Sequence, residues 1–326
     1  GLVLMKEVLF TIAGKRLGMV FNIGARALSS QSLNIHAGHD DVMACTDVGW
    51  GMLFSKNAQE AADLALIARR AAEQSETPFM SIQDGFLTTH TVERVLKPEE
   101  ALMAQFVGHP STKIRNLFDT SNPVMSGSVQ NQDSYMKGKI AQRSFYDKVP
   151  DALQESMNEF YRLTGRRYDF VEEYRLDDAD YAIVGMGTLT ETAMASADYM
   201  RAFMDIRVGV LNVSTFRPFP GPRIVEALKH VQAFAVVERL DVPLAQSNPL
   251  TAEIKAALAD AMIGSEGYPR IKGIPRILSG VAGLGGRDIK ASDFVAVIQN
   301  MVLNNSDTKE FFVLGIHHPM ALTSDI

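Results

Sequence analysis

The sequence NAQEAADLALIARRAAEQSETPFMSI, residues 57–82, contains a clear helix-then-strand pattern. Asn57 and Glu60 stand three residues apart, which is the spacing of a capping box at the start of a helix. Apolar residues then recur at helical intervals over residues 61–70, and a short β-rich run follows at 78–82. A capped helix followed closely by a strand predicts one α/β unit.

The same alternation continues toward the N-terminus. Residues 19–23 predict a strand, a helix is expected from Arg26, and residues 41–45 predict another strand. Strands that alternate with helices are typical of a parallel sheet, because parallel strands need a crossover connection between them. The first part of the chain is therefore expected to be an α/β domain.

A second α/β series occupies the C-terminal half. Its predicted strands are residues 181–185, 208–213 and 233–237, and its predicted helices are residues 191–204, 221–229 and 250–262. Residues 276–279 and 311–316 predict two late strands that complete the sheet. The expected fold is α/β, with two domains that each have a mainly parallel sheet flanked by helices.

The domain boundary is expected near residue 172, which gives domains 1–172 and 173–326. A predicted helix at 150–164 ends at Gly165, a plausible C-cap, shortly before this boundary. Periodicity is weak over about 84–148, where Pro, Asn, Ser and Gly recur. We expect this segment to be a long excursion packed on the first domain and ordered by contact with another domain or subunit, since long structureless loops are uncommon.

Composition excludes several classes of function. The chain has 326 residues, 46% of them hydrophobic and 21% charged, and a formal net charge of −6. This balance is typical of a globular protein and offers no broad cationic field for nucleic acid. The longest apolar runs are far shorter than the roughly 20 residues of a membrane-spanning helix. We therefore expect no nucleic-acid partner, no membrane span and no secretory signal.

Cys45 is the single cysteine. One thiol cannot form an internal disulfide or supply the several ligands of an iron–sulfur cluster. Its apolar neighbours in Val42-Met-Ala-Cys45 favour a small buried core residue over a reactive thiol.

Arg26 follows the first predicted strand directly, within Gly24-Ala-Arg-Ala. Open parallel sheets bind ligands at the carboxyl ends of their strands, and an arginine there can hold a carboxylate through two hydrogen bonds. The alternative is a surface arginine that opens a helix. The residue alone favours this alternative.

Longer motifs surround Arg26 and continue along the chain. They are Gly24-Ala-Arg-Ala-Leu with His39-Asp-Asp-Val-Met-Ala, the stretch Pro78-Phe-Met-Ser-Ile-Gln-Asp-Gly-Phe-Leu-Thr-Thr-His90, Ser144-Phe-Tyr-Asp-Lys-Val-Pro150, Leu163-Thr-Gly-Arg-Arg-Tyr168, Gly185-Met-Gly-Thr-Leu-Thr-Glu-Thr192 and Phe216-Arg-Pro-Phe-Pro220. Together they resemble the 2-oxoacid oxidoreductases, above all the pyruvate:ferredoxin (flavodoxin) oxidoreductase family. The resemblance covers nearly the whole chain.

This resemblance implies part of a thiamine-diphosphate pyrimidine-binding-like domain I followed by a transketolase C-terminal-like domain II. It also implies oxidative decarboxylation of pyruvate to acetyl-CoA, with thiamine diphosphate and Mg²⁺ as cofactors and iron–sulfur clusters that pass electrons to ferredoxin or flavodoxin. Arg26 matches the arginine that binds the pyruvate carboxylate, while the resemblance assigns no cofactor-binding or metal-binding residue of this chain.

The family's other groups fall outside the chain. A threonine and a glutamate of the family's site lie upstream of Gly1, and the diphosphate, magnesium, coenzyme A and cluster ligands lie downstream of Ile326. The resemblance thus implies that other domains or subunits complete the enzyme, that the full enzyme is a cytoplasmic homodimer, or one of an organellar matrix in a eukaryote, and that this chain alone is inactive. Two stretches, His36-Ala-Gly-His39 and Cys45-Thr-Asp-Val-Gly-Trp50, differ from the usual sequence of the family. They leave open which 2-oxoacid is preferred.

Four other motifs have a functional and a structural interpretation. His36 and His39 have the spacing of a metal pair, but the glycine between them and the absence of a third ligand favour polar loop histidines. Asp84-Gly-Phe favours a turn after a strand over a kinase motif. Gly185-Met-Gly favours close strand–helix packing over a phosphate cradle, because the third glycine of the dinucleotide fingerprint is missing. Glu238-Arg239 is interpreted as structural.

A second function belongs to a different class. Modules related to this family occur in sulfite reductase subunits, so the chain could be a noncatalytic, thiamine-domain-like scaffold. The match at Arg26 favours the oxidoreductase, and the altered sequence at residues 36–39 permits the scaffold.

Overall fold

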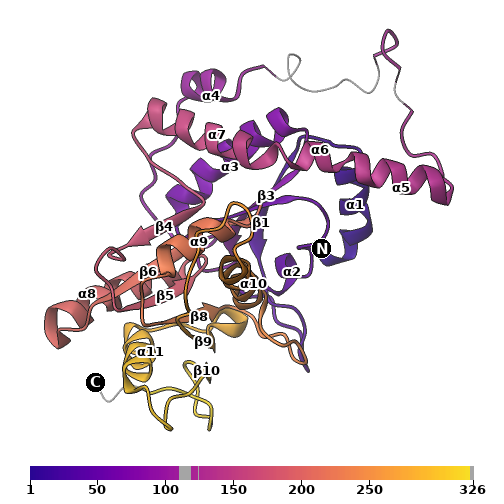
Figure 1. Cartoon of the computed structure of the whole chain (residues 1–326). Coiled ribbons are helices and arrows are strands. Elements are labelled where there is room, and N and C mark those ends of the chain that lie inside the picture. Colours follow the sequence, from indigo (N-terminus) through magenta and orange to yellow (C-terminus); the bar gives the residue numbers. More distant parts are fainter. Residues whose placement is uncertain (110–118, 124, 324–326) are drawn as a thin grey trace.

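The computed structural model describes residues 1–109, 119–123 and 125–323, and its strands form two sheets (Figure 1). The first sheet has the order β1-β3-β2-β7 and the second has the order β10-β9-β8-β5-β6-β4. All neighbouring strands are parallel except β7, which is antiparallel to β2, and β4, which is antiparallel to β6. The predicted fold class, two mainly parallel sheets flanked by helices, is confirmed.

The first sheet combines three strands from the N-terminal half with one from the C-terminal half. Its strands are β1 (Val20–Ala25), β2 (Gly51–Phe54), β3 (Phe79–Asp84) and β7 (Thr215–Arg217). Around it lie α1 (Lys6–Gly14), α2 (Asp40–Met43), α3 (Ala58–Ser75) and α7 (Val149–Thr164). Because β7 crosses to the first sheet, the two sheets are joined by more than a linker, and the boundary near residue 172 stays a prediction.

The second sheet is built from the C-terminal half. Its strands are β4 (Val171–Tyr174), β5 (Tyr181–Gly185), β6 (Val208–Val213), β8 (Ala233–Glu238), β9 (Arg276–Val281) and β10 (Phe311–Val313). Its helices are α8 (Leu189–Met204), α9 (Gly221–Leu228), α10 (Pro249–Ile263) and α11 (Ala291–Leu303). Every strand and helix predicted for this half is present, while β4, β7 and α11 were not predicted.

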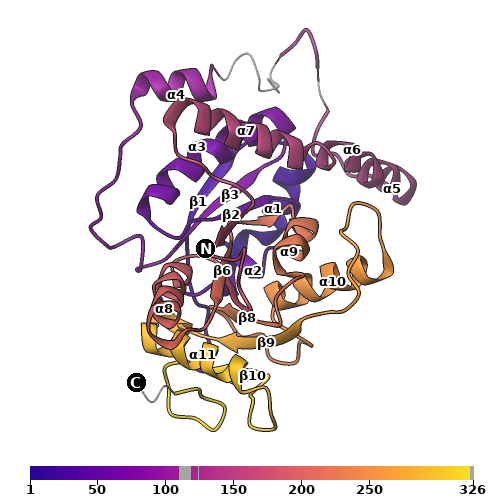
Figure 2. The same ribbon diagram turned by 60° about the vertical axis from the view of Figure 1, so that its left-hand side comes forward.

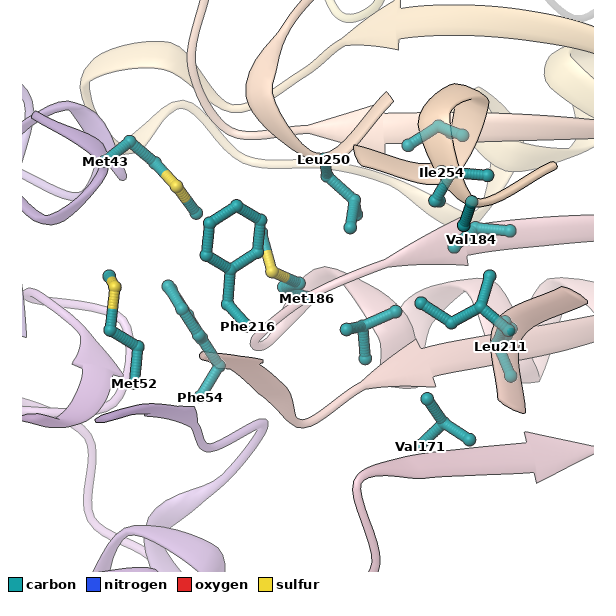
Figure 3. Packing of buried hydrophobic residues seen from close by; sticks show 14 of the residues in the cluster. Met43, Met52, Phe54, Val171, Val184, Met186, Leu211, Phe216, Leu250 and Ile254 are labelled. Carbon is teal, nitrogen blue, oxygen red and sulfur yellow. The ribbon is translucent and has the colours of Figure 1, made fainter. Parts of the chain in front are cut away.

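The buried apolar side chains form three clusters. Successive residues of a strand face opposite sides of its sheet, and apolar residues cover both sides, as is usual for parallel sheets. Leu53 and Phe79 face α3 and α7, whereas Phe54 and Met80 face the second sheet. The far side of the second sheet packs against α8 and α11. Figure 3 shows the middle cluster, in which Phe216 lies between Phe54 of the first sheet and the side chains of the second. The two sheets therefore share one core.

Local signals explain the two N-terminal helices that the sequence predicted best. The Asn57 side chain accepts a hydrogen bond from the Glu60 amide (2.9 Å) and starts α3. Gly165, with φ of 73°, ends α7 in the left-handed conformation that glycine adopts without strain.

Two predictions around Arg26 were wrong. Residues 27–38 form a loop instead of a helix, because the Asn34 side chain accepts a hydrogen bond from the His36 amide (2.7 Å) and competes with helical bonding. Residues 41–45 are not a strand but include α2 and the turn that follows it. Asp40 and Asp41 lie in the first turn of α2, where acidic side chains are favourable.

The segment predicted as a long excursion contains α4 (Glu100–Val107), α5 (Gln132–Ala141) and α6 (Arg143–Tyr146). Residues 110–118 and 124 of this segment lie outside the described residues. The α4 helix lies against α3 and α7, and Phe106 is fully buried there, edge-on to Phe160 with ring centroids 5.2 Å apart. By contrast, α5 projects from the body of the molecule in both views (Figures 1 and 2).

We predict that Phe106→Ala lowers the free energy of unfolding by about 3–5 kcal/mol, because it removes a fully buried ring and leaves a cavity between α4 and α7. Urea denaturation measures the loss. Val129→Ala, at a fully exposed position of the same segment, is the control and should change stability little. Equal stabilities of the two variants would contradict the described packing.

Candidate functional site

The carboxyl ends of β1 and β3 meet at one edge of the first sheet. The two strands are parallel and in register, so that Ala25 lies beside Asp84 at their ends. The Gly85 amide continues the pairing and donates to the Ala25 carbonyl (2.9 Å). Arg26 and Phe86 follow these strand ends, at the edge where open α/β sheets bind ligands.

Arg26 is exposed at this edge. Its amide donates to the Asp41 carboxylate (3.1 Å), which fixes the backbone while the side chain points elsewhere. The guanidinium carbon lies 5.4 Å from the centroid of the Phe86 ring, and no carboxylate in the described ranges pairs with this guanidinium. The sequence predicted Arg26 as an anion-binding residue, and this arrangement leaves its charge available to an external anion.

Aromatic rings surround the Phe86 side chain. His90 stacks on it with centroids 4.4 Å apart and an interplanar angle of 4°, and His36 lies 4.5 Å away at 51°. Phe86 itself has φ of 63°, an uncommon conformation for a bulky residue, and its amide donates to the Thr89 hydroxyl (2.8 Å). Arg26 therefore borders a small aromatic surface, and such local strain is often found at functional sites.

Two residues before Phe86, a buried polar cluster is centred on Asp84, whose side chain is only 1% exposed. His39 Nε2 bonds to one carboxylate oxygen (2.7 Å). The other oxygen accepts from the Thr188 amide (3.1 Å) and hydroxyl (2.5 Å), and Arg239 Nε lies 3.4 Å from it. These four residues, which we call the Asp84 cluster, come from both halves of the chain.

The charges and hydrogen bonds around Asp84 determine its ionisation. Burial alone would raise the pKa of the carboxyl group, but the positive charge of Arg239, the His39 imidazole and the Thr188 hydrogen bond outweigh it. The pKa of Asp84 is therefore held well below its usual range, and the carboxylate stays ionised inside the protein.

This carboxylate also occupies the N-terminal end of α8. Gly187 has φ of 74°, and a Cβ atom there would lie 3.0 Å from both Asp84 oxygens. At Gly185 a Cβ atom would lie 2.5 Å from a Leu189 methyl carbon. The Gly185-Met-Gly sequence thus provides close strand–helix packing, as predicted, and the anion at this helix end is the protein's own Asp84.

Arg239 is the cluster's contribution from the second sheet, and sequence reasoning missed its importance. It is 2% exposed and donates to the Thr188 hydroxyl (3.2 Å) and the Gly283 carbonyl (3.3 Å). The feature of the sequence that could have indicated it is the charged pair Glu238-Arg239 at the end of the apolar strand β8. The Glu238 carboxylate accepts from the Leu250 amide (2.8 Å) and Thr251 amide (3.0 Å) and so caps α10, which agrees with a structural role.

The two histidines predicted as polar loop residues differ. Both lie in the loop before α2, where His36 is exposed and His39 is buried because Asp84 provides a buried partner for its imidazole. Among the described residues no group of three or more His, Cys, Asp or Glu side chains is arranged to hold a metal ion. Cys45 is buried, and burial raises the pKa of its thiol, which agrees with the predicted core role.

Two family models match the chain. The first, described as pyruvate flavodoxin/ferredoxin oxidoreductase, thiamine diphosphate-binding, matches residues 1–158. The second, described as pyruvate:ferredoxin oxidoreductase core domain II, matches residues 179–294. Each half of the chain thus resembles one of two families named for the same enzyme.

Similar curated proteins carry related names. The pyruvate-flavodoxin oxidoreductase of Klebsiella pneumoniae is 34% identical over 99% of this chain, and the match covers 27% of that protein. Pyruvate synthase subunit PorA of Thermotoga maritima is 34% identical over 97% of this chain and 78% of that protein. The chain thus spans about a quarter of the pyruvate-flavodoxin oxidoreductase and most of the PorA subunit.

A solved structure shows the same fold. It is the 2-oxoglutarate:ferredoxin oxidoreductase from Magnetococcus marinus, with 2-oxoglutarate, coenzyme A and succinyl-CoA bound. The match has a TM-score of 0.58 at 13% identity and covers 93% of this chain and 51% of that one. Within the described part of this chain, no helix is long and apolar enough to span a membrane.

We predict that Asp84→Asn lowers the free energy of unfolding by about 3–5 kcal/mol near neutral pH, because it leaves Arg239 buried without its counter-ion. A depressed folded-state pKa gives stability that is present above the unfolded-state pKa, about 3.9, and is lost as the pH falls below it. Urea denaturation at several pH values should therefore show a constant difference between the two proteins above about pH 5 and a smaller one below about pH 4. A difference that grows on acidification would contradict the described ionisation of Asp84.

Proposed function

Because the chain belongs to the pyruvate flavodoxin/ferredoxin oxidoreductase family, we propose that it forms the part of a 2-oxoacid oxidoreductase in which Arg26 binds the substrate carboxylate. The proposed reaction is the oxidative decarboxylation of pyruvate to acetyl-CoA. One observation supports this role. Arg26 is an exposed cation at the carboxyl edge of a parallel sheet, and no carboxylate of the described residues pairs with it.

The geometry suits a small planar anion. A guanidinium presents a flat pair of N–H donors that matches a carboxylate, and charge-assisted bonds of this kind are stronger than neutral ones. The Phe86 ring, whose centroid lies 5.4 Å from the guanidinium carbon, provides an apolar neighbour on one side of the bound anion's position. A 2-oxoacid held by its carboxylate has its neighbouring carbonyl fixed in one place, and such positioning lowers the barrier to reaction.

Thiamine diphosphate is the cofactor that the matching family description names. The described residues do not supply a complete site for it, because the anion position at α8 is filled by Asp84 and these residues form no metal-ligand group. We propose that other segments or subunits hold the diphosphate, Mg²⁺ and coenzyme A. Iron–sulfur clusters are likewise assigned to other segments, because Cys45 is the single cysteine of the chain and is buried.

The proposed oxidoreductase function also implies which partners the chain has. They are the remaining domains or subunits of the oxidoreductase, a second copy of the complete enzyme, and ferredoxin or flavodoxin as the electron acceptor. We propose a cytoplasmic location for the assembly, or an organellar matrix in a eukaryote.

In the complete enzyme, we predict that Arg26→Ala removes on the order of 2–5 kcal/mol of substrate binding or transition-state stabilisation, as when one partner of a desolvated charge pair is lost. Arg26→Lys should recover little, because an ammonium group does not reproduce the planar fork. Pyruvate-dependent reduction of the acceptor measures the effect, and thermal melting shows whether the variants stay folded.

Arg162→Ala provides the control, because Arg162 is exposed on α7 and its ion pair with Glu159 is local. This variant should keep the parent kinetics. Unchanged kinetics in a folded Arg26→Ala variant would contradict the proposed function and favour the noncatalytic scaffold.

A further inference from the structure

We propose that Asp84 and His39 are positioning residues that hold Arg26 in its substrate-binding place, and that the second sheet takes part in this through Arg239. The inference rests on the proposed function of Arg26. It extends the substrate site from one exposed arginine to a buried cluster that joins the two halves of the chain.

The backbone on both sides of Arg26 is attached to residues next to the Asp84 cluster. On one side, Ala25 accepts a hydrogen bond from Gly85, the residue after Asp84. That contact is tight, since a Cβ atom on Gly85 would lie 2.6 Å from the Ala25 oxygen. On the other side, the Arg26 carbonyl accepts a hydrogen bond from the amide of Asp41 (3.4 Å), two residues after His39. A shift of either Asp84 or His39 would therefore move the backbone that carries the guanidinium.

The loop between Arg26 and His39 is held against the second half of the chain. The Asn34 side chain donates to the Gly285 carbonyl (3.4 Å), and a Cβ atom on Gly286 would lie 2.7 Å from the His36 Cβ. The same glycine-rich segment receives Arg239, because Gly283 accepts a hydrogen bond from that guanidinium. Residues 283–286 thus contact both the loop and a member of the Asp84 cluster.

The buried charges of Arg239 and Asp84 favour one relative position of the two halves of the chain. Arg239 and Asp84 are 2% and 1% exposed, so a local shift that separates them inside the protein leaves a buried charge without its partner, which is strongly unfavourable. The His39 imidazole is equally buried, and its amide also donates to the Arg239 carbonyl (3.0 Å). One arrangement is therefore strongly preferred, and this is the kind of support that keeps a binding side chain in place before substrate arrives.

A double-mutant cycle in the complete enzyme separates positioning from a general loss of stability. His39→Leu removes the imidazole but leaves Asp84 paired with Arg239 and Thr188, so it disturbs the buried charges less than Asp84→Asn does. We expect either variant to raise the KM for pyruvate at least tenfold, with a smaller change in kcat. In an Arg26→Ala background, the same substitutions should raise KM less than twofold further. His39→Gln, whose amide nitrogen can donate to Asp84, should restore most of the affinity.

Asp63→Asn is the matched control. Asp63 is also fully buried and paired with an arginine, since Arg166 donates to both of its oxygens (2.6 and 3.0 Å), but it lies on α3 and takes no part in the cluster. This variant should lower the melting temperature and leave the KM for pyruvate unchanged. A general effect of breaking a buried ion pair would raise KM in this variant too.

Limited trypsin digestion gives a readout that does not depend on activity. If the cluster anchors the loop, cleavage after Arg26 should be at least fivefold faster in His39→Leu than in the parent enzyme, and unchanged in Asp63→Asn. Unchanged cleavage after Arg26, or a KM effect that is fully additive with Arg26→Ala, would overturn the positioning role. An Arg26→Ala variant with normal KM would instead sink the proposed function, and the digestion would still decide whether the loop is anchored.

Discussion

The ionised Asp84 carboxylate is buried at the end of β3, where its charge needs partners inside the protein. Neither half of the chain supplies all of these partners alone. His39 comes from the loop before α2, while Thr188 and Arg239 come from the second α/β series. An unpaired charge in such a place would cost several kcal/mol, so the two sheets must come together in one way for the carboxylate to be compensated.

Apolar packing and this polar cluster have different effects. The shared core around Phe54 and Phe216 brings the sheets together, but hydrophobic contact is non-directional and allows related packings. Hydrogen bonds to Asp84 are directional and fix the register between the end of β3, the start of α8 and the end of β8. The edge that carries Arg26 is therefore built from the same contacts that join the two halves. We infer that binding of the substrate and packing of the sheets are linked for this reason.

The sequence predicted the regular elements well and the loop around Arg26 poorly. The helix α3 has a strong local signal in its Asn57 cap, and β5, β6 and β8 of the second sheet have continuous apolar runs, whereas β4 has two glutamates and was missed. The strand β2 has only four residues and β7 has three, so neither gives a clear period. Residues 27–38 were predicted wrongly because Asn34 bonds to the nearby His36 amide and to the distant Gly285 carbonyl, which no periodicity reveals. Residues 41–45 were predicted wrongly because a short apolar run is also compatible with a helix, and the first turn of α2 holds Asp40 and Asp41. The prediction for Arg26 depended on family resemblance, whereas the importance of Arg239 had no periodic signal, because a buried ion pair appears only when two remote segments meet.

The structure of the assembled oxidoreductase with pyruvate bound would test the role of Arg26 most sharply. Both oxygens of the pyruvate carboxylate should accept hydrogen bonds from the Arg26 guanidinium, at about 2.7–2.9 Å, while Asp84 keeps its contacts with His39 and Arg239. A pyruvate carboxylate bound by other residues, with the Arg26 side chain directed into solvent, would contradict this role of Arg26.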